Sequence, residues 1–155
     1  REEVLDILDR AEREGHVLQP QNSREPGFIC CCCRDCCEVL RNARKLPRPA
    51  DAIPSGYQAV VDAQRCTACK RCLKRCPMDA ITITNATAQI DTDRCIGCGL
   101  CATSCPQQAI TLVKRERAPR TPKTNTMMYL GMYAKRRGVL GLLPIALKKL
   151  FGRKI

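Results

Sequence analysis

Alternating apolar and polar residues predict four short strands in the middle of the chain. The stretches AVVD (59–62), AITIT (80–84), AQID (88–91) and AITLV (109–113) are rich in Val, Ile and Thr. These residue types favour strands, and the alternation between apolar and polar positions fits a strand with one buried face. The pattern therefore predicts four strands of four or five residues each.

A different spacing at the start of the chain predicts an amphipathic helix. Within residues 2–16 the apolar side chains fall on one helical face, and Gly15 is a typical helix stop. The residues on this face are Val4, Leu5, Leu8 and Ala11. His16 follows the stop and is predicted to be a capping or surface residue, not a ligand.

The central part of the chain repeats itself once. Residues 61–84 align with residues 90–113 at a constant offset, as Cys66 and Cys95 show. Each copy contains the pattern C-x2-C-x2-C-x3-C-P. We expect each copy to form a strand, a cysteine loop, a short helical turn after the Cys-Pro pair and a returning strand, so that two copies make a small α+β sandwich.

Composition indicates that metal is needed to hold this fold together. The chain has 155 residues, aromatic residues are 3% of it, and the 45% hydrophobic fraction includes 14 cysteines. If these cysteines bind metal, the apolar core is small, and small cores usually need disulfides or metal. Zinc prefers isolated C-x2-C pairs, and disulfides give no reason for a duplicated spacing.

The two cysteine patterns resemble those of bacterial two-cluster ferredoxins, and the resemblance covers residues 57–115. In that family the first three cysteines of each pattern and the fourth cysteine of the other pattern hold one [4Fe–4S] cluster. The resemblance implies that cluster one is held by Cys66, Cys69, Cys72 and Cys105. It implies that cluster two is held by Cys95, Cys98, Cys101 and Cys76.

Two such clusters change what the charge and the compartment imply. The formal net charge is +12, and two clusters of about −2 each would lower it to about +8. The chain stays basic, which suits an acidic docking face on a redox protein or enzyme subunit. Oxygen-sensitive clusters indicate a reducing, oxygen-poor compartment, so we expect a cytoplasmic protein of an anaerobe and no disulfides.

Cations in the first cysteine loop predict a difference between the clusters. Lys70, Arg71, Lys74 and Arg75 lie in the first loop, whereas the second has Gly and Ala at several of these places. Nearby cations stabilise the charge added on reduction, so cluster one is predicted to have the higher potential.

Residues 30–37 carry six further cysteines. If the backbone is extended, Cys30 and Cys32 face one way, and a turn at Arg34-Asp35 could return Cys36 and Cys37 toward them. The predicted third metal site is therefore Cys30, Cys32, Cys36 and Cys37, and Cys33 could replace any of these four. It could hold a third iron–sulfur cluster, zinc or another structural metal, or it could be a redox-active thiol cluster. The segment resembles cysteine-dense stretches that precede the dicluster domain in ferredoxin-like proteins of anaerobes.

Proline-rich and basic stretches divide the chain into four predicted parts. Residues 1–27 form the helix and a connector, and residues 28–56 form the cysteine-dense segment and an extended, Pro-rich linker. Residues 57–115 form the dicluster domain, and residues 116–155 form a basic amphipathic tail with a helix from Pro144. The tail has no run of apolar residues long enough to span a bilayer. It could cover the dicluster domain, dock on another subunit or lie on an anionic membrane.

The leading functional hypothesis is an electron carrier, or an electron-transfer subunit of an oxidoreductase, that relays single electrons through two [4Fe–4S] clusters. No arrangement of side chains suggests catalysis. The alternative gives the cysteine-dense segment a catalytic or assembly role, with the clusters supplying electrons. A third hypothesis is an iron–sulfur sensor that binds nucleic acid through the basic stretch. Because that stretch lacks interleaved aromatic residues, no nucleic acid is expected.

Overall fold

The computed structural model describes residues 1–138, which fall into two compact units. Unit 1 consists of residues 1–19 and 30–119, and unit 2 consists of residues 20–29 and 120–155, of which residues 139–155 lie outside the described part. The four predicted parts have different boundaries and remain predictions. The elements below are described within each unit.

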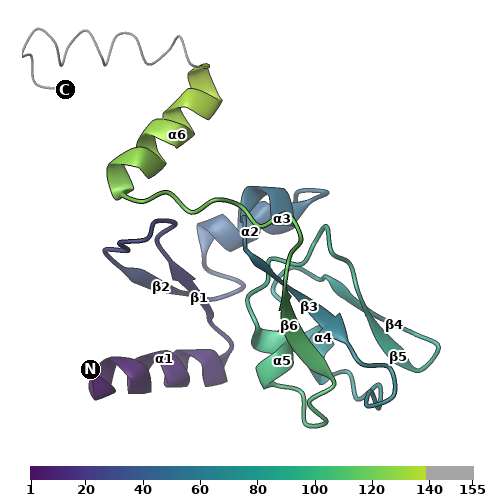
Figure 1. Ribbon diagram of the computed structural model, residues 1–155. Coiled ribbons are helices and arrows are strands. Elements are labelled where there is room, and N and C mark those ends of the chain that lie inside the picture. The colour runs from purple at the N-terminus through teal and green to yellow at the C-terminus, as the bar shows by residue number, and fades with distance from the viewer. Residues whose placement is uncertain (139–155) are drawn as a thin grey trace, which may run out of the picture. The chain divides into compact units, whose positions relative to one another are not determined.

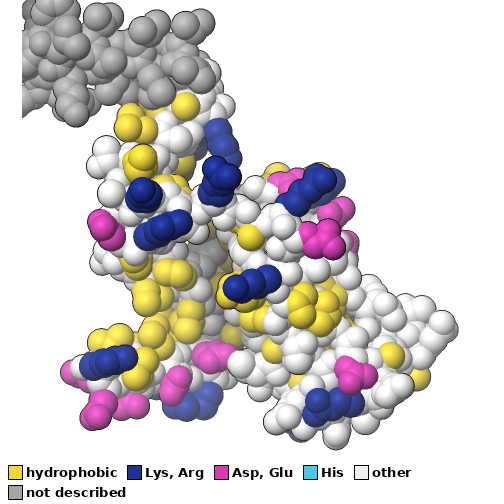
Figure 2. All heavy atoms as spheres, viewed as in Figure 1, with side chains coloured by type: hydrophobic (Ala, Val, Ile, Leu, Met, Phe, Trp, Pro, Cys, Tyr) yellow, Lys and Arg dark blue, Asp and Glu magenta, His cyan; other side chains and the backbone are white. Residues whose placement is uncertain are grey.

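The N-terminal helix of unit 1 begins and ends where the sequence predicts. Helix α1 spans Glu2–Glu14, and Gly15 follows it in the left-handed conformation at φ 94°. The backbone N–H of Gly15 donates to Glu12 and that of His16 donates to Ala11, which together form a Schellman cap. The solvent-facing side of α1 is acidic, as the magenta side chains over this helix in Figure 2 show.

The four predicted strands are present in unit 1, and they pair in two antiparallel sheets (Figure 1). Strand β3 (Tyr57–Val61) pairs with β6 (Ile110–Lys114), so that Ala59 lies opposite Leu112. Strand β4 (Ile81–Thr84) pairs with β5 (Thr87–Ile90). Each sheet has two strands. The first and last strands of the repeat, β3 and β6, pair with each other, and the two middle strands, β4 and β5, form a hairpin. The prediction of a mixed α+β chain is confirmed.

The two short helices of the repeat lie one step earlier than predicted. Helix α4 spans Arg71–Arg75 and α5 spans Leu100–Thr103, so both precede the Cys-Pro pair. After each Cys-Pro pair the structure has only a turn, at residues 77–78 and 106–107, and no helix. Each helix ends before its cysteine because proline disfavours the helical conformation at the residue that precedes it. Cys76 accordingly has φ −74° and ψ 116°.

The core of unit 1 is small and contains sulfur. Leu40, Met78, Leu100 and Pro49 are the largest fully buried side chains. Four thiols share this core, and they belong to Cys72, Cys76, Cys95 and Cys101. Because the apolar part is limited, groups bound by the thiols would contribute much of the stability.

The segment before the repeat contains two short helices. Helix α2 (Glu38–Arg44) buries Leu40, and the one-turn helix α3 (Pro49–Ala52) begins at a buried proline. Arg48 forms ion pairs of 3.1 Å with both Asp51 and Asp93. The prediction of an extended connector is therefore wrong for α3, since proline is well suited to the first turn of a helix.

Two further strands and one further helix complete the described chain. Strands β1 (Val17–Pro20) and β2 (Ile29–Cys32) pair in a sheet of their own. In unit 2, helix α6 spans Asn125–Arg137, and the Thr124 hydroxyl accepts the backbone N–H of Met127 at 3.3 Å. Among the described residues, no helix is both long enough and apolar enough to cross a bilayer. The helix predicted from Pro144 lies outside the described residues.

Candidate metal centres

The two cysteine loops turn at equivalent backbone positions. In the first loop Ala68 and Lys70 have positive φ angles of 51° and 62°. In the second loop the positions 29 residues later are Gly97 and Gly99, with φ angles of 66° and 86°. Left-handed residues let the chain reverse between successive cysteines, so three thiols of each loop are directed to the same side. Only the second loop uses glycine, the residue that tolerates this conformation without strain.

The first cavity lies beside the first loop and receives one cysteine from the second loop. It is lined by thiols and by the apolar side chains of Ile83, Ala88 and Ile110. The four thiols around it belong to Cys66, Cys69, Cys72 and Cys105. These are the four residues predicted to hold cluster one, and the structure brings them together.

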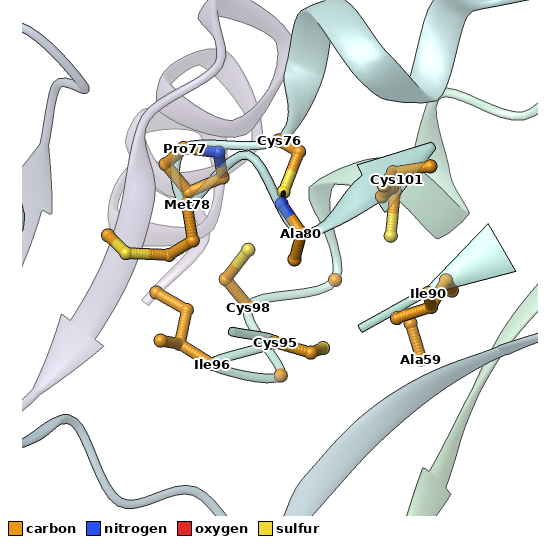
Figure 3. A pocket seen from close by; sticks show the side chains of 13 residues that line it. Ala59, Cys76, Pro77, Met78, Ala80, Ile90, Cys95, Ile96, Cys98 and Cys101 are labelled. Carbon is orange, nitrogen blue, oxygen red and sulfur yellow. Dashed lines mark hydrogen bonds between the residues drawn. The ribbon is translucent and has the colours of Figure 1, made fainter. Parts of the chain in front are cut away.

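The second cavity repeats the arrangement with the loops exchanged. Its apolar lining includes Ala59, Ile81 and Ile90. Figure 3 shows four cysteines around one space, and they are Cys76, Cys95, Cys98 and Cys101. These are the four residues predicted to hold cluster two. In each cavity, therefore, three thiols come from one loop and the fourth comes from the other.

Backbone N–H groups point at several of these sulfurs. Ala80 donates to Cys76 at 3.3 Å, and the equivalent Ala109 donates to Cys105 at 3.3 Å. Ala88 donates to Cys66 at 3.5 Å. Such bonds stabilise thiolates and iron–sulfur ligands, and an apolar lining excludes water.

Four thiols line each cavity, which is the ligand set of a cuboidal iron–sulfur cluster. No three His, Cys, Asp or Glu side chains within residues 1–138 are arranged around a single metal ion. A cuboidal cluster, by contrast, spans a cavity and binds one thiolate at each of four iron atoms. The residues present therefore fit an iron–sulfur cluster in each cavity.

Burial alters the acidity of these thiols. Desolvation raises the pKa of Cys98 to about 11 and the pKa of Cys101 to about 12. Burial also raises the pKa of Cys72 and of Cys76. Metal-free thiols of this kind are protonated at neutral pH, so binding a metal as thiolates must release protons.

Three arginines of unit 1 donate hydrogen bonds to backbone carbonyls of residues that line the second cavity. Arg115 donates to the carbonyl of Cys95 at 2.6 Å, and Arg94 donates to that of Met78 at 2.9 Å. Arg34 donates to the carbonyl of Cys76 at 2.8 Å. Arg75, which the sequence assigns to the first loop, instead donates to the Glu12 carbonyl of α1 at 2.7 Å. The sequence places Arg94 directly before Cys95, whereas only the fold brings Arg34 and Arg115 to the second cavity.

The cysteine-dense segment follows the predicted path, with an extended strand β2 and then a turn. Cys30, Cys32 and Cys37 lie together, since the Cys32 thiol interacts with both other thiols and also contacts Gln19 at 3.4 Å. Desolvation and these thiols raise the pKa of Cys32 to about 12. For Cys37, burial acts to raise the pKa, but hydrogen bonds from Leu40 and neighbouring groups outweigh it and lower the pKa.

The expectation that this segment has no disulfide is wrong. Cys33 and Cys36 are joined by a disulfide, and their Cα atoms are 5.7 Å apart. The turn at residues 34–36 causes this, because it brings the two cysteines within the separation of roughly 4.4–6.8 Å that a disulfide needs. Cys36 is consequently not gathered with the other three predicted ligands of the third site. That this segment binds a metal stays a prediction.

Comparison with known proteins agrees with the chemistry of the two cavities. Two family models, both described as a 4Fe-4S dicluster domain, match the chain at residues 59–112 and residues 94–133. The search of curated proteins found no match. The first match covers all eight cysteines that line the two cavities.

The chain therefore contains a ferredoxin-type 4Fe-4S dicluster domain, accompanied by a separate cysteine-rich segment. Domains of this class bind iron–sulfur cofactors and transfer electrons, either as free carriers or as subunits of oxidoreductases.

Proposed function

We propose that the chain relays single electrons through two [4Fe–4S] clusters, as a carrier or as an electron-transfer subunit of an oxidoreductase. Cluster one would be held by Cys66, Cys69, Cys72 and Cys105, and cluster two by Cys95, Cys98, Cys101 and Cys76. When bound, each cluster would take up and release one electron. The observation that carries this proposal is the pair of cavities, each lined by three thiols of one loop and one thiol of the other.

The exchange of the fourth cysteine has a structural consequence. Cys76 leaves the first loop at the end of α4 and lines the cavity of the second loop, and Cys105 does the reverse. Each cluster would thus tie both copies of the repeat together. We propose that the repeat is a duplicated unit that each cluster stabilises and that unfolds when both clusters are lost.

The first cavity is the better candidate for contact with a redox partner. Cys69 is exposed there, whereas three of the four cysteines at the second cavity are buried. Lys70 and Arg71 line the first cavity, and both are exposed. We propose that an acidic face of a redox protein docks here, because opposite charges orient and accelerate such encounters. The cytoplasm of an anaerobic cell is the compartment that we propose, since low-potential clusters survive best without oxygen.

Alkylation of the cluster-loaded chain tests the ligand exchange. Cysteines bound to iron are protected from iodoacetamide, and those released by loss of a cluster are not. Changing Cys76 to serine should expose the three cysteines of the second loop and leave those of the first loop protected. The matched change Cys105→Ser should expose the first loop and protect the second.

The opposite pattern would contradict the proposal. If Cys76→Ser exposed the first loop, each loop would hold its own cluster with all four of its cysteines. Peptide mass spectrometry of the alkylated chain separates the two patterns, because the loops yield different peptides.

A further inference from the structure

The cysteine-dense segment contains one disulfide beside four free thiols. Cys33 and Cys36 form the disulfide, and Cys30, Cys31, Cys32 and Cys37 are free. Cys36 is exposed and Cys33 is half-buried, and the backbone N–H of Cys36 also donates to the sulfur of Cys33 at 2.9 Å. A pair in the C-x2-C spacing, with one accessible sulfur, has the layout of a reactive dithiol.

Arg34 connects this pair to the second cavity. It lies directly after Cys33 in the chain, and its guanidinium donates to the carbonyl of Cys76 at 2.8 Å. The same guanidinium forms an ion pair of 2.6 Å with Asp79. Only a side chain and one hydrogen bond therefore separate the disulfide segment from a proposed ligand of cluster two.

We propose that the Cys33–Cys36 disulfide is a two-electron acceptor served by the two clusters; this inference rests on the proposed function. The Cys33–Cys36 bond would accept two electrons, one from each cluster that the two cavities would hold when reduced. The S–S bond would break, each sulfur would take one proton from solvent, and two thiols would form, with each cluster left one electron more oxidised. The chain thereby converts single electrons into a dithiol that a two-electron acceptor can use.

Two physical arguments favour this role over a structural disulfide. Disulfides in reducing compartments are usually transient and catalytic, because the cellular thiol pool keeps others reduced. The number of electrons also matches within the chain. Two clusters that carry one electron each would supply the two electrons that reduction of one disulfide needs. The exposed position of Cys36 gives protons and an acceptor access to the pair.

The test uses the full chain with its clusters, prepared without oxygen and with the clusters oxidised. A short light pulse with a deazaflavin reduces the clusters and bleaches their visible absorption, and recovery in the dark is then recorded. The chain should recover its absorption as the disulfide opens, whereas Cys33→Ser should stay bleached. Cys36→Ser is the second variant, and Cys31→Ser, which removes a free exposed thiol of the same segment, is the control that should recover.

Alkylation followed by mass spectrometry gives an independent measurement. Cys33 and Cys36 should resist iodoacetamide while the clusters are oxidised and should react after dark recovery. The inference is overturned if the unsubstituted chain stays bleached, or if both cysteines already react in the oxidised protein. It is also overturned if the iron content is about twelve per chain and falls to about eight in Cys33→Ser, because residues 30–37 would then hold a third cluster. A chain without visible absorption would contradict the proposed function itself.

Discussion

Replacing Gly97 with alanine should damage the second cavity through one specific contact. A Cβ atom at Gly97 would lie 2.2 Å from the carbonyl oxygen of Tyr57 and 2.7 Å from the hydroxyl of Ser55. The first neighbour is backbone at the start of β3, so it cannot rotate away. Gly97 also lines the cavity, and its φ of 66° is strained for alanine.

The expected cost follows from two contributions. A left-handed alanine costs about 1–2 kcal/mol. Overpacking against fixed backbone costs about 1–3 kcal/mol more. Gly99→Ala is the matched control, because Gly99 is also left-handed at φ 86° but its Cβ would meet only the flexible Leu112 side chain at 3.3 Å. The difference between the two variants isolates the clash with Tyr57.

Thermal unfolding of the cluster-loaded chain under anaerobic conditions measures this difference. Gly97→Ala should melt about 5–20 °C below Gly99→Ala, which corresponds to the clash alone in a small domain. Its iron content should also fall toward half, since only the second cavity is affected. Equal melting temperatures for the two variants would refute the reasoning, because both share the backbone strain and only one has the clash.

Three further predictions concern the same domain. Ala68→Gly should raise stability by about 0.5–1 kcal/mol in thermal or denaturant unfolding, because relief of the left-handed strain exceeds the added entropy of the unfolded chain; an unchanged or lower stability would contradict this. Arg115→Gln should lower the reduction potential of the cluster beside Cys95 by roughly 20–70 mV in an EPR redox titration. This is the effect of a unit charge about 10 Å away at an effective dielectric constant of about 20–80. A shift in the potential of the other cluster alone would argue against this prediction. Removing iron with a chelator should abolish the circular dichroism of the domain in one cooperative step, since buried thiols form part of its core; a native-like spectrum without iron would oppose this account.

Much of the dicluster domain could be predicted because its signals are local. Val, Ile and Thr in alternation located the four strands, and the cysteine spacing identified the residues that line each cavity. The position of α4 and α5 was misjudged, although the information was present. Pro77 and Pro106 disfavour a helical conformation at the preceding cysteine, so each helix is expected to end before it.

Features that depend on tertiary contacts could not be read from the sequence. Arg34 and Arg115 are 42 and 20 residues away from the carbonyls of Cys76 and Cys95 that they contact. No short sequence pattern predicts contacts between residues so far apart in the chain. That cluster one has the higher reduction potential stays a prediction. Arg34 and Arg115 near the second cavity would act in the opposite direction, because they would raise the potential of cluster two. The Cys33–Cys36 pair was missed for another reason: the assumed reducing compartment was taken to exclude disulfides of every kind.

Helix α6 was also missed from the sequence. Residues 114–126 are basic and contain prolines, which are unfavourable inside a helix, and the helix begins only at Asn125. Thr124 is the N-cap residue, and threonine at this position is a sequence signal for the start of a helix. The last proline before it is Pro122, so no proline interrupts the helix that follows.

The iron and acid-labile sulfide content of the anaerobically purified chain tests the central claim most directly. Two cuboidal clusters held by the exchanged cysteines predict about eight iron atoms and about eight sulfides per chain, with a brown absorption. A colourless protein that contains zinc and no sulfide would contradict the account.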